Sequence, residues 1–336
     1  MSVLSVGDLS NTFQIRRQTT ALKQSLARLG TELASGQKQD IGAALGGDFG
    51  PFAGINHHLK TLGAFKTATS EAATLLSATQ LTMAQIQDAG RDLSPALLTA
   101  SSARDGTLIR STAQDARQKL DMVAAHLNTR IANRTLLAGA ATDRAAMAPG
   151  SVIMDELLVA VAGETTAAGI AQAVEDWFTA PGGGFETIAY LGATTHSGPV
   201  AISPDETVGV EMRADDPAFR SMLQSLALSG LIAEGVLDGD ISQQAELTAR
   251  AAEGLLLADE ALTLARADVG AAQARVETAT ARNAAEVTAH ELMRAELVGA
   301  DPYQTATELE AVYSQIETLY TVTARIAGLR FTDFMR

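Results

Sequence analysis

The segment ISQQAELTARAAEGLLLADEALTLARADVGAAQARVETATARNAAEVTAHELMRAELV, residues Ile241–Val298, decides the fold of this chain. It is the longest stretch without a helix-breaking cluster, and 16 of the 50 residues 251–300 are alanine, the residue with the highest helix propensity. We predict a single helix, which at 1.5 Å per residue would be about 85 Å long. A helix this long needs a partner along its length, so the segment indicates a helical bundle or rod.

The composition of the whole chain supports a mainly α architecture. Its 336 residues include 63 alanines, whereas aromatic residues make up only 4%. Few bulky side chains are available for a round core, which favours long helices packed on one another. The chain has no cysteine, which excludes disulfide scaffolds, thiolate metal sites and cysteine nucleophiles. We expect no membrane-spanning helix and no cleaved secretory signal at MSVLSVGDLSNTFQIRR.

The net charge of −14 is unevenly distributed along the sequence. Residues 151–240 contain 14 acidic residues against Arg213 and Arg220, and therefore carry −12 of the total. By contrast, residues 1–40 have five basic and three acidic residues. An acidic surface repels phosphate backbones, so we do not expect a nucleic-acid partner.

Both ends of the chain have the periodicity of a coiled coil. Apolar residues step by three and four within residues 1–35 and again within residues 302–336, which is the spacing of an apolar stripe on a helix. We predict that these two helices pair with each other. A lone two-helix hairpin has little core of its own, so we expect neighbouring copies or partners to cover the rest. We call the predicted contact residues the assembly seam: Ile15, Leu22, Leu26, Leu29, Leu33, Leu309, Val312, Ile316, Leu319 and Ile326.

The sequence between the two ends alternates helical patterns with breakers. Gly36 can cap the first helix, and the glycine-rich residues 36–52 are predicted to form a loop. Further helices are expected over 53–98, with a break at Ser94-Pro95 or Asp105-Gly106, over 107–137 with an end near Gly139, and over 153–161, 167–178 and 217–233. Short strands are expected over 187–191, 199–202 and 207–212.

These patterns predict three domains. Residues 1–35 and 302–336 would form a terminal coiled-coil domain, and residues 36–140 and 216–301 a long-helix rod. Residues 141–215 would form a small α+β insert, because proline and glycine breakers recur throughout that segment.

No set of residues supports a catalytic, cofactor or metal site. His57 and His58 are adjacent on a helix and point about 100° apart, so one ion cannot easily bind both. Asp238-Gly239-Asp240 lacks the glycine spacing and terminal glutamate of a calcium loop, and Gly182–Gly184 lacks the lysine of a phosphate loop. We therefore expect a protein that is not an enzyme and has no cofactor.

Two blocks of sequence resemble the flagellin-like family of bacterial flagellar proteins. LARLGTELASGQKQDIGAALGGDFGPFAGI (Leu26–Ile55) is similar to the family's leucine-rich helix, Ser-Gly and polar loop. The region Val269–Met335 resembles the family's C-terminal signature, in which a long helix, Ala-Asp and a heptad helix end near Leu-x-Phe-x-x-Phe. LNTRIANRTLLAGAATDRAAMAP (Leu127–Pro149) and the segment Phe185–Leu223 are similar to the branch that joins the hook to the filament.

The resemblance implies a structural protein of the flagellum. Such a protein is exported unfolded through the flagellar type III channel without a cleaved signal. Its paired terminal helices line the inner tube, and its insert faces solvent. The implied partners are copies of the same chain in a ring, a neighbouring hook-associated protein, flagellin, and a cytoplasmic chaperone that binds the C-terminal helix.

Two other interpretations remain open from the sequence. Filament flagellin itself shares both terminal blocks. A helical signalling or scaffold protein, such as a chemoreceptor-like rod, would also be rich in long helices, although the lack of an apolar span argues against it.

Overall fold

The computed structural model describes the backbone of residues 6–209 and 211–334, and the side chains of residues 10, 12–209 and 211–325. The chain forms two compact units. Unit 1 contains the residues up to Gly63 and those from Ala284 onward, and unit 2 contains Ala64–Asn283. The mainly α fold predicted from the sequence is confirmed, since helices dominate and the strands are few and short.

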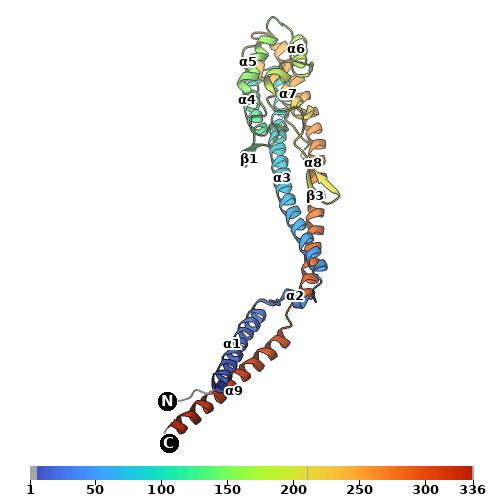
Figure 1. The fold of residues 1–336 in the computed structure, drawn as a ribbon. Helices are drawn as coiled ribbons and strands as arrows, with labels where there is room; N and C mark the ends of the chain where they lie inside the picture. Colours follow the sequence, from blue (N-terminus) through green and yellow to red (C-terminus); the bar gives the residue numbers. More distant parts are fainter. Residues whose placement is uncertain (1–5, 210, 335–336) are drawn as a thin grey trace. The chain divides into compact units, whose positions relative to one another are not determined.

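Unit 1 is built around two antiparallel helices. Helix α1 (Val6–Ser35) lies alongside α9 (Pro302–Phe334), as Figure 1 shows. The short helix α2 (Ile41–Ala44) follows α1, and the unit also holds the first part of α3 (Gly50–Ala103) and the last part of α8 (Ile241–Val298). The predicted pairing of the two ends of the chain is therefore present within a single molecule.

Unit 2 contains a continuous apolar core. Helices α4 (Gly106–Leu127) and α7 (Pro217–Ala233) pack against each other, and α5 (Gly150–Ala160) and α6 (Ala167–Thr179) cover them. The part of α3 in this unit is joined to α8 by polar contacts, for example from Gln87 Nε2 to Thr263 Oγ1 at 2.8 Å. The largest buried aromatic side chains are Phe178, Phe185 and Phe219.

The strands of unit 2 form two small antiparallel hairpins. Strand β1 (Arg130–Ile131) pairs with β2 (Arg134–Thr135), and β3 (Val200–Ser203) pairs with β4 (Glu206–Val208). The predicted strand over 187–191 is wrong, because Phe185–Ala189 forms a turn of π-helix, η1. That turn buries Phe185 beside Phe178, with ring centroids 5.6 Å apart. Aromatic packing therefore overrides the β-like local sequence.

Of the two predicted breaks, the one at Ser94-Pro95 is wrong and the one at Asp105-Gly106 is confirmed. Helix α3 runs through the exposed Pro95 to Ala103, and Asp105 caps the next helix, α4. One helix ends earlier than predicted. Helix α4 ends at Leu127 instead of Leu137. Asn128 Oδ1 accepts hydrogen bonds from the amides of Ala146 (2.7 Å) and Met147 (2.9 Å), which turns the chain away from the helix. The predicted loop at 36–52 contains α2 and the start of α3.

The two units divide the chain inside α3 and α8, at 63/64 and 283/284. The predicted insert, residues 141–215, lies in unit 2, where α5 and α6 pack against α4 and α7. The three-domain division remains a prediction.

Candidate assembly surface

The apolar stripe of α1 lies in the contact with α9, and burial varies along it. Leu29 is almost fully buried, with 2% of its surface exposed. Ile15, Leu22 and Leu26 are half-buried, and Leu33 is 39% exposed. The stripe therefore becomes less covered away from Leu29, in both directions along the helix.

The α9 side of the assembly seam is half-buried throughout. Leu309, Val312, Ile316 and Leu319 are each partly exposed, and the side chain of Ile326 lies outside the described residues. A hairpin within one chain thus covers these side chains incompletely. The described side chains leave part of this apolar surface exposed, and removing it from water would contribute about 25 cal/mol for each Å².

An open groove of about 480 Å³ lies between α1 and α9. It includes Leu22 and Leu319 of the assembly seam, and Val322 at one side is 44% exposed. Small and polar side chains complete its walls. The residues that line it are Gln18, Ala21, Leu22, Ser314, Gln315, Thr318, Leu319 and Val322.

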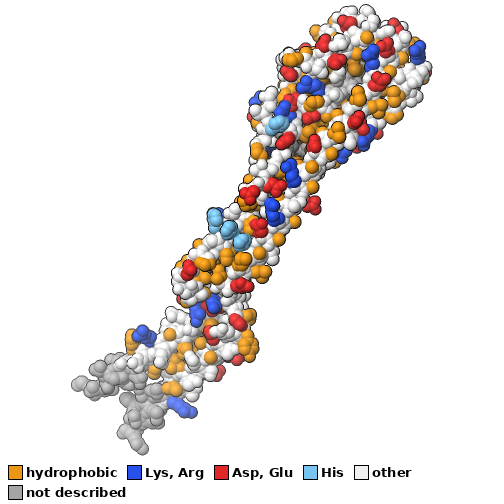
Figure 2. Space-filling view, turned by 90° about the vertical axis from the view of Figure 1, so that its right-hand side faces the viewer, with side chains coloured by type: hydrophobic (Ala, Val, Ile, Leu, Met, Phe, Trp, Pro, Cys, Tyr) orange, Lys and Arg blue, Asp and Glu red, His pale blue; other side chains and the backbone are white. Residues whose placement is uncertain are grey.

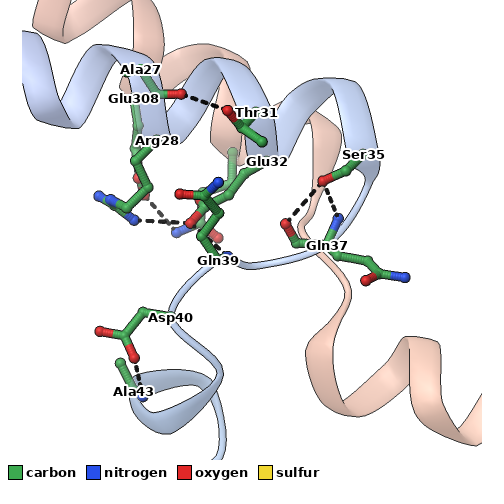
Figure 3. Close-up of polar contacts among 11 residues, drawn as sticks. Ala27, Arg28, Thr31, Glu32, Ser35, Gln37, Gln39, Asp40, Ala43 and Glu308 are labelled. Atoms are coloured by element: carbon green, nitrogen blue, oxygen red, sulfur yellow. Dashed lines mark hydrogen bonds and ion pairs between the residues drawn. The ribbon is translucent and has the colours of Figure 1, made fainter.

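A polar junction forms where α1 ends, around the buried side chain of Glu32. Glu32 is only 5% exposed, and its Oε1 accepts hydrogen bonds from Arg28 Nη1 at 3.2 Å and from the Gln39 amide at 3.0 Å (Figure 3). Sequence reasoning missed this residue, because a single glutamate in an amphipathic helix carries no signal of burial. The buried, paired carboxylate ties the chain that follows α1 back onto the helix.

Backbone hydrogen bonds complete the junction. Gly36, at φ +68°, donates its amide to the Glu32 carbonyl at 2.8 Å, which confirms the predicted glycine cap. The Ala300 amide donates to the Gly36 carbonyl at 3.0 Å, and the Lys38 amide donates to the Val298 carbonyl at 2.9 Å. Residues 36–38, which follow α1, and residues 298–300, which precede α9, therefore pair as a short antiparallel bridge. This bridge sets the register of α1 against α9.

The histidines group more closely than the sequence suggested. The rings of His58 and His290 stack 5.1 Å apart at an interplanar angle of 4°, and the ring of His57 is 6.1 Å from that of His58. Figure 2 shows a patch of histidine side chains on the surface. Within the part of the chain that the structure describes, no three or more His, Cys, Asp or Glu side chains are arranged to hold a metal ion.

Tyr190, Arg213 and Asp215 form a polar cluster in unit 2. The Tyr190 hydroxyl donates to the Ala193 carbonyl at 2.7 Å, and burial, with the nearby Asp215 carboxylate, raises the pKa of Tyr190 to about 12. Arg213 binds the same carboxylate at 2.8 Å, which raises the pKa of its guanidinium. These residues hold the loop before β3, and their sequence spacing resembles no catalytic motif.

No helix in the described residues is long and apolar enough to cross a membrane.

Comparisons with known proteins found similarity to flagellar proteins. Residues 257–330 match the family model of the bacterial flagellin C-terminal helical region. The fold is similar to the crystal structure of FlgL from Bacillus cereus, with a TM-score of 0.51 and 11% identity over 70% of this chain and 96% of that chain. It is also similar to a "putative flagellar hook-associated protein" from Vibrio parahaemolyticus, with a TM-score of 0.51 and 10% identity over 73% of this chain and 94% of that chain. No curated protein sequence matches the chain. The C-terminal part thus matches a flagellin-type helical region, in a chain whose fold is similar to that of flagellar hook-associated proteins.

Proposed function

We propose that this protein joins the hook to the filament of the bacterial flagellum, as hook-associated protein 3. The observation that carries the proposal is the half-buried α1–α9 seam, in a chain whose residues 257–330 match the flagellin C-terminal helical region. The likeness of the fold to FlgL and to the Vibrio protein supports the same role.

In this role, copies of the chain assemble as a ring through α1 and α9. A hook-associated protein lies on one side of the ring and flagellin on the other. The chain reaches this position by type III export without a cleaved signal, and a cytoplasmic chaperone binds α9 before export. The half-buried apolar residues of α9 can serve two partners in turn. The chaperone would cover them before export, and neighbouring copies would cover them after assembly.

The decisive experiment is to locate the protein on isolated flagella by immunogold labelling. A single labelled position between hook and filament is expected. Deletion of the gene should leave hooks on the cell and shed flagellin into the medium. Label along the whole filament would contradict the junction role.

The second candidate is filament flagellin itself, because the matching family model describes the C-terminal region of flagellins. The same deletion separates the two. Loss of a flagellin removes the filament subunit from both the cell surface and the medium, whereas loss of a junction protein leaves flagellin abundant in the medium.

A further inference from the structure

The exposed face of α1 carries several basic side chains. Arg16, Arg17 and Lys23 are exposed, and none of them forms an ion pair with the described side chains. Arg28 is different, since it binds the buried Glu32 at 3.2 Å. Cations without an ion pair among the described side chains therefore concentrate on the part of α1 that precedes the polar junction.

The exposed face of α9 has the opposite charge. Glu310 and Glu317 are exposed, and neither contacts a cation among the described side chains. Between and beside them lie Tyr313 and Tyr320, which are 54% and 55% exposed. Steps of three and four residues place these four side chains along one face of the helix. That face thus alternates carboxylates with large aromatic rings.

The spacings of the two charged pairs match. Arg16 and Lys23 are seven residues apart, and so are Glu310 and Glu317. Seven residues span nearly two turns of a helix, which keeps each pair on one face with its members about 10.5 Å apart. Two cations on one helix can therefore meet two carboxylates on another helix at the same time.

We propose that α1 of one copy docks against the antiparallel α9 of a second copy, with Arg16 opposite Glu317 and Lys23 opposite Glu310. The inference rests on the proposed function, because it names the contact between neighbouring copies in the assembly. Exposed ion pairs contribute little individually, and their role here is to select the register and the partner helix. The half-covered apolar side chains of the assembly seam supply the buried area that holds the copies together.

A second copy is the occupant that the charges favour. Both halves of the complementary surface are present on every copy, so one type of contact can repeat from subunit to subunit. A nucleic acid would meet Arg16 and Lys23 but would be repelled by the α9 carboxylates and by a net charge of −14. The exposed tyrosines add contact area and can stack on guanidinium groups of the facing helix.

The test is a charge swap in cells that lack the wild-type gene. One variant carries Arg16→Glu and Lys23→Glu, a second carries Glu310→Lys and Glu317→Lys, and a third combines all four changes. Protein in purified flagella and in the medium is measured by immunoblot. Each half-swap should reduce incorporation about tenfold, with export retained, because two exposed pairs are replaced by like charges. The combined variant should restore incorporation.

A matched control separates the interface from net charge. Lys66→Glu with Arg110→Glu changes the charge by the same amount as the α1 half-swap, at exposed and unpaired positions of unit 2. It should assemble like the wild type. Half-swaps that assemble normally, or a combined variant that remains as poor as either half-swap, would overturn the proposal.

A cross-link provides a second measurement that does not depend on charge. Since the chain has no cysteine, Lys23→Cys and Glu310→Cys can be produced as two differently tagged copies in one cell. A short bis-maleimide should join the two tags in purified flagella, whereas Lys66→Cys in place of Lys23→Cys should give no such product. If the α1 half-swap blocks export, the α9 half-swap and this cross-link still test whether α1 of one copy contacts α9 of another. Wild-type protein absent from the flagella would instead refute the proposed function, and this inference with it.

Discussion

The turn at Gly139 provides a sharp test of how unit 2 is held together. Gly139 has φ +61°, a left-handed conformation that favours glycine. A Cβ at this position would lie 2.5 Å from the Thr195 carbonyl oxygen and 2.6 Å from that of Ala193. Both oxygens belong to backbone, which cannot rotate away as a flexible side chain can. Gly139→Ala must therefore displace the 193–195 segment.

The cost follows from the bonds on either side of that turn. The Ala140 amide donates to Thr195 and the Ala193 amide donates to the Ala138 carbonyl, each at 2.9 Å. Loss of both would cost about 1–3 kcal/mol in total, given about 0.5–1.5 kcal/mol for each net hydrogen bond. The left-handed backbone adds about 1–2 kcal/mol for a residue with a Cβ. We therefore expect Gly139→Ala to lower the free energy of unfolding of unit 2 by about 2–5 kcal/mol.

Gly163→Ala is the matched control. Gly163 has φ +93°, but a Cβ there would meet no atom within 4 Å. The control therefore loses only the backbone contribution, about 1–2 kcal/mol. Urea unfolding followed by the fluorescence of Trp177, the single tryptophan, measures both variants in unit 2. If Gly139→Ala proves no less stable than Gly163→Ala, the carbonyl contacts do not determine the stability of this turn and the reasoning fails.

Three further predictions concern the two units. Leu309→Asp or Ile316→Asp should abolish incorporation into flagella, because a charge would be buried in the assembly. The circular dichroism spectrum and the unfolding of unit 2 should stay unchanged. Normal motility of either variant would contradict this prediction. The contribution of Tyr190 to the free energy of unfolding should fall as the pH rises from 10 through 12, since the unfolded state releases the Tyr190 proton from about pH 10 and the folded state only near 12. Tyr190→Phe should be less stable at pH 8 but lose this part of the alkaline decrease, as parallel urea titrations would show. In limited proteolysis of the free protein, cleavage within 10–35 or 302–325 should precede cleavage within 64–283, because the seam is only half-buried; resistant ends would refute that.

The sequence predicted the elements whose signals are local. The bounds of α7 and α8 agree with the prediction at Pro217–Ala233 and Ile241–Val298. Asp216 Oδ1 accepts a hydrogen bond from the Ala218 amide at 3.0 Å, and Pro217 occupies the first helical position. Two adjacent residues therefore determine where α7 begins. Helix α8 depends on alanine content and on the absence of proline, which are equally local.

The elements that were mispredicted depend on contacts between residues distant in sequence. The end of α4 is decided by Asn128 reaching the Ala146 and Met147 amides, and the π-helical turn by Phe185 packing on Phe178. At the candidate site, heptad spacing predicted which helices pair. It could not predict the burial of Glu32, because that burial depends on how the chain crosses itself after α1.

The two units bury their apolar side chains to different extents, and this difference bears on the order of assembly. Unit 2 encloses Phe178, Phe185 and Phe219 completely, so its helices have a core without any partner. In unit 1, Leu29 is enclosed, but the assembly-seam residues of α9 remain half-buried. A hairpin that gains burial only from neighbours is stabilised by the concentration of those neighbours. Within the proposed function, unit 2 therefore folds first after export, and α1 and α9 become stable at the growing end, where other copies are present.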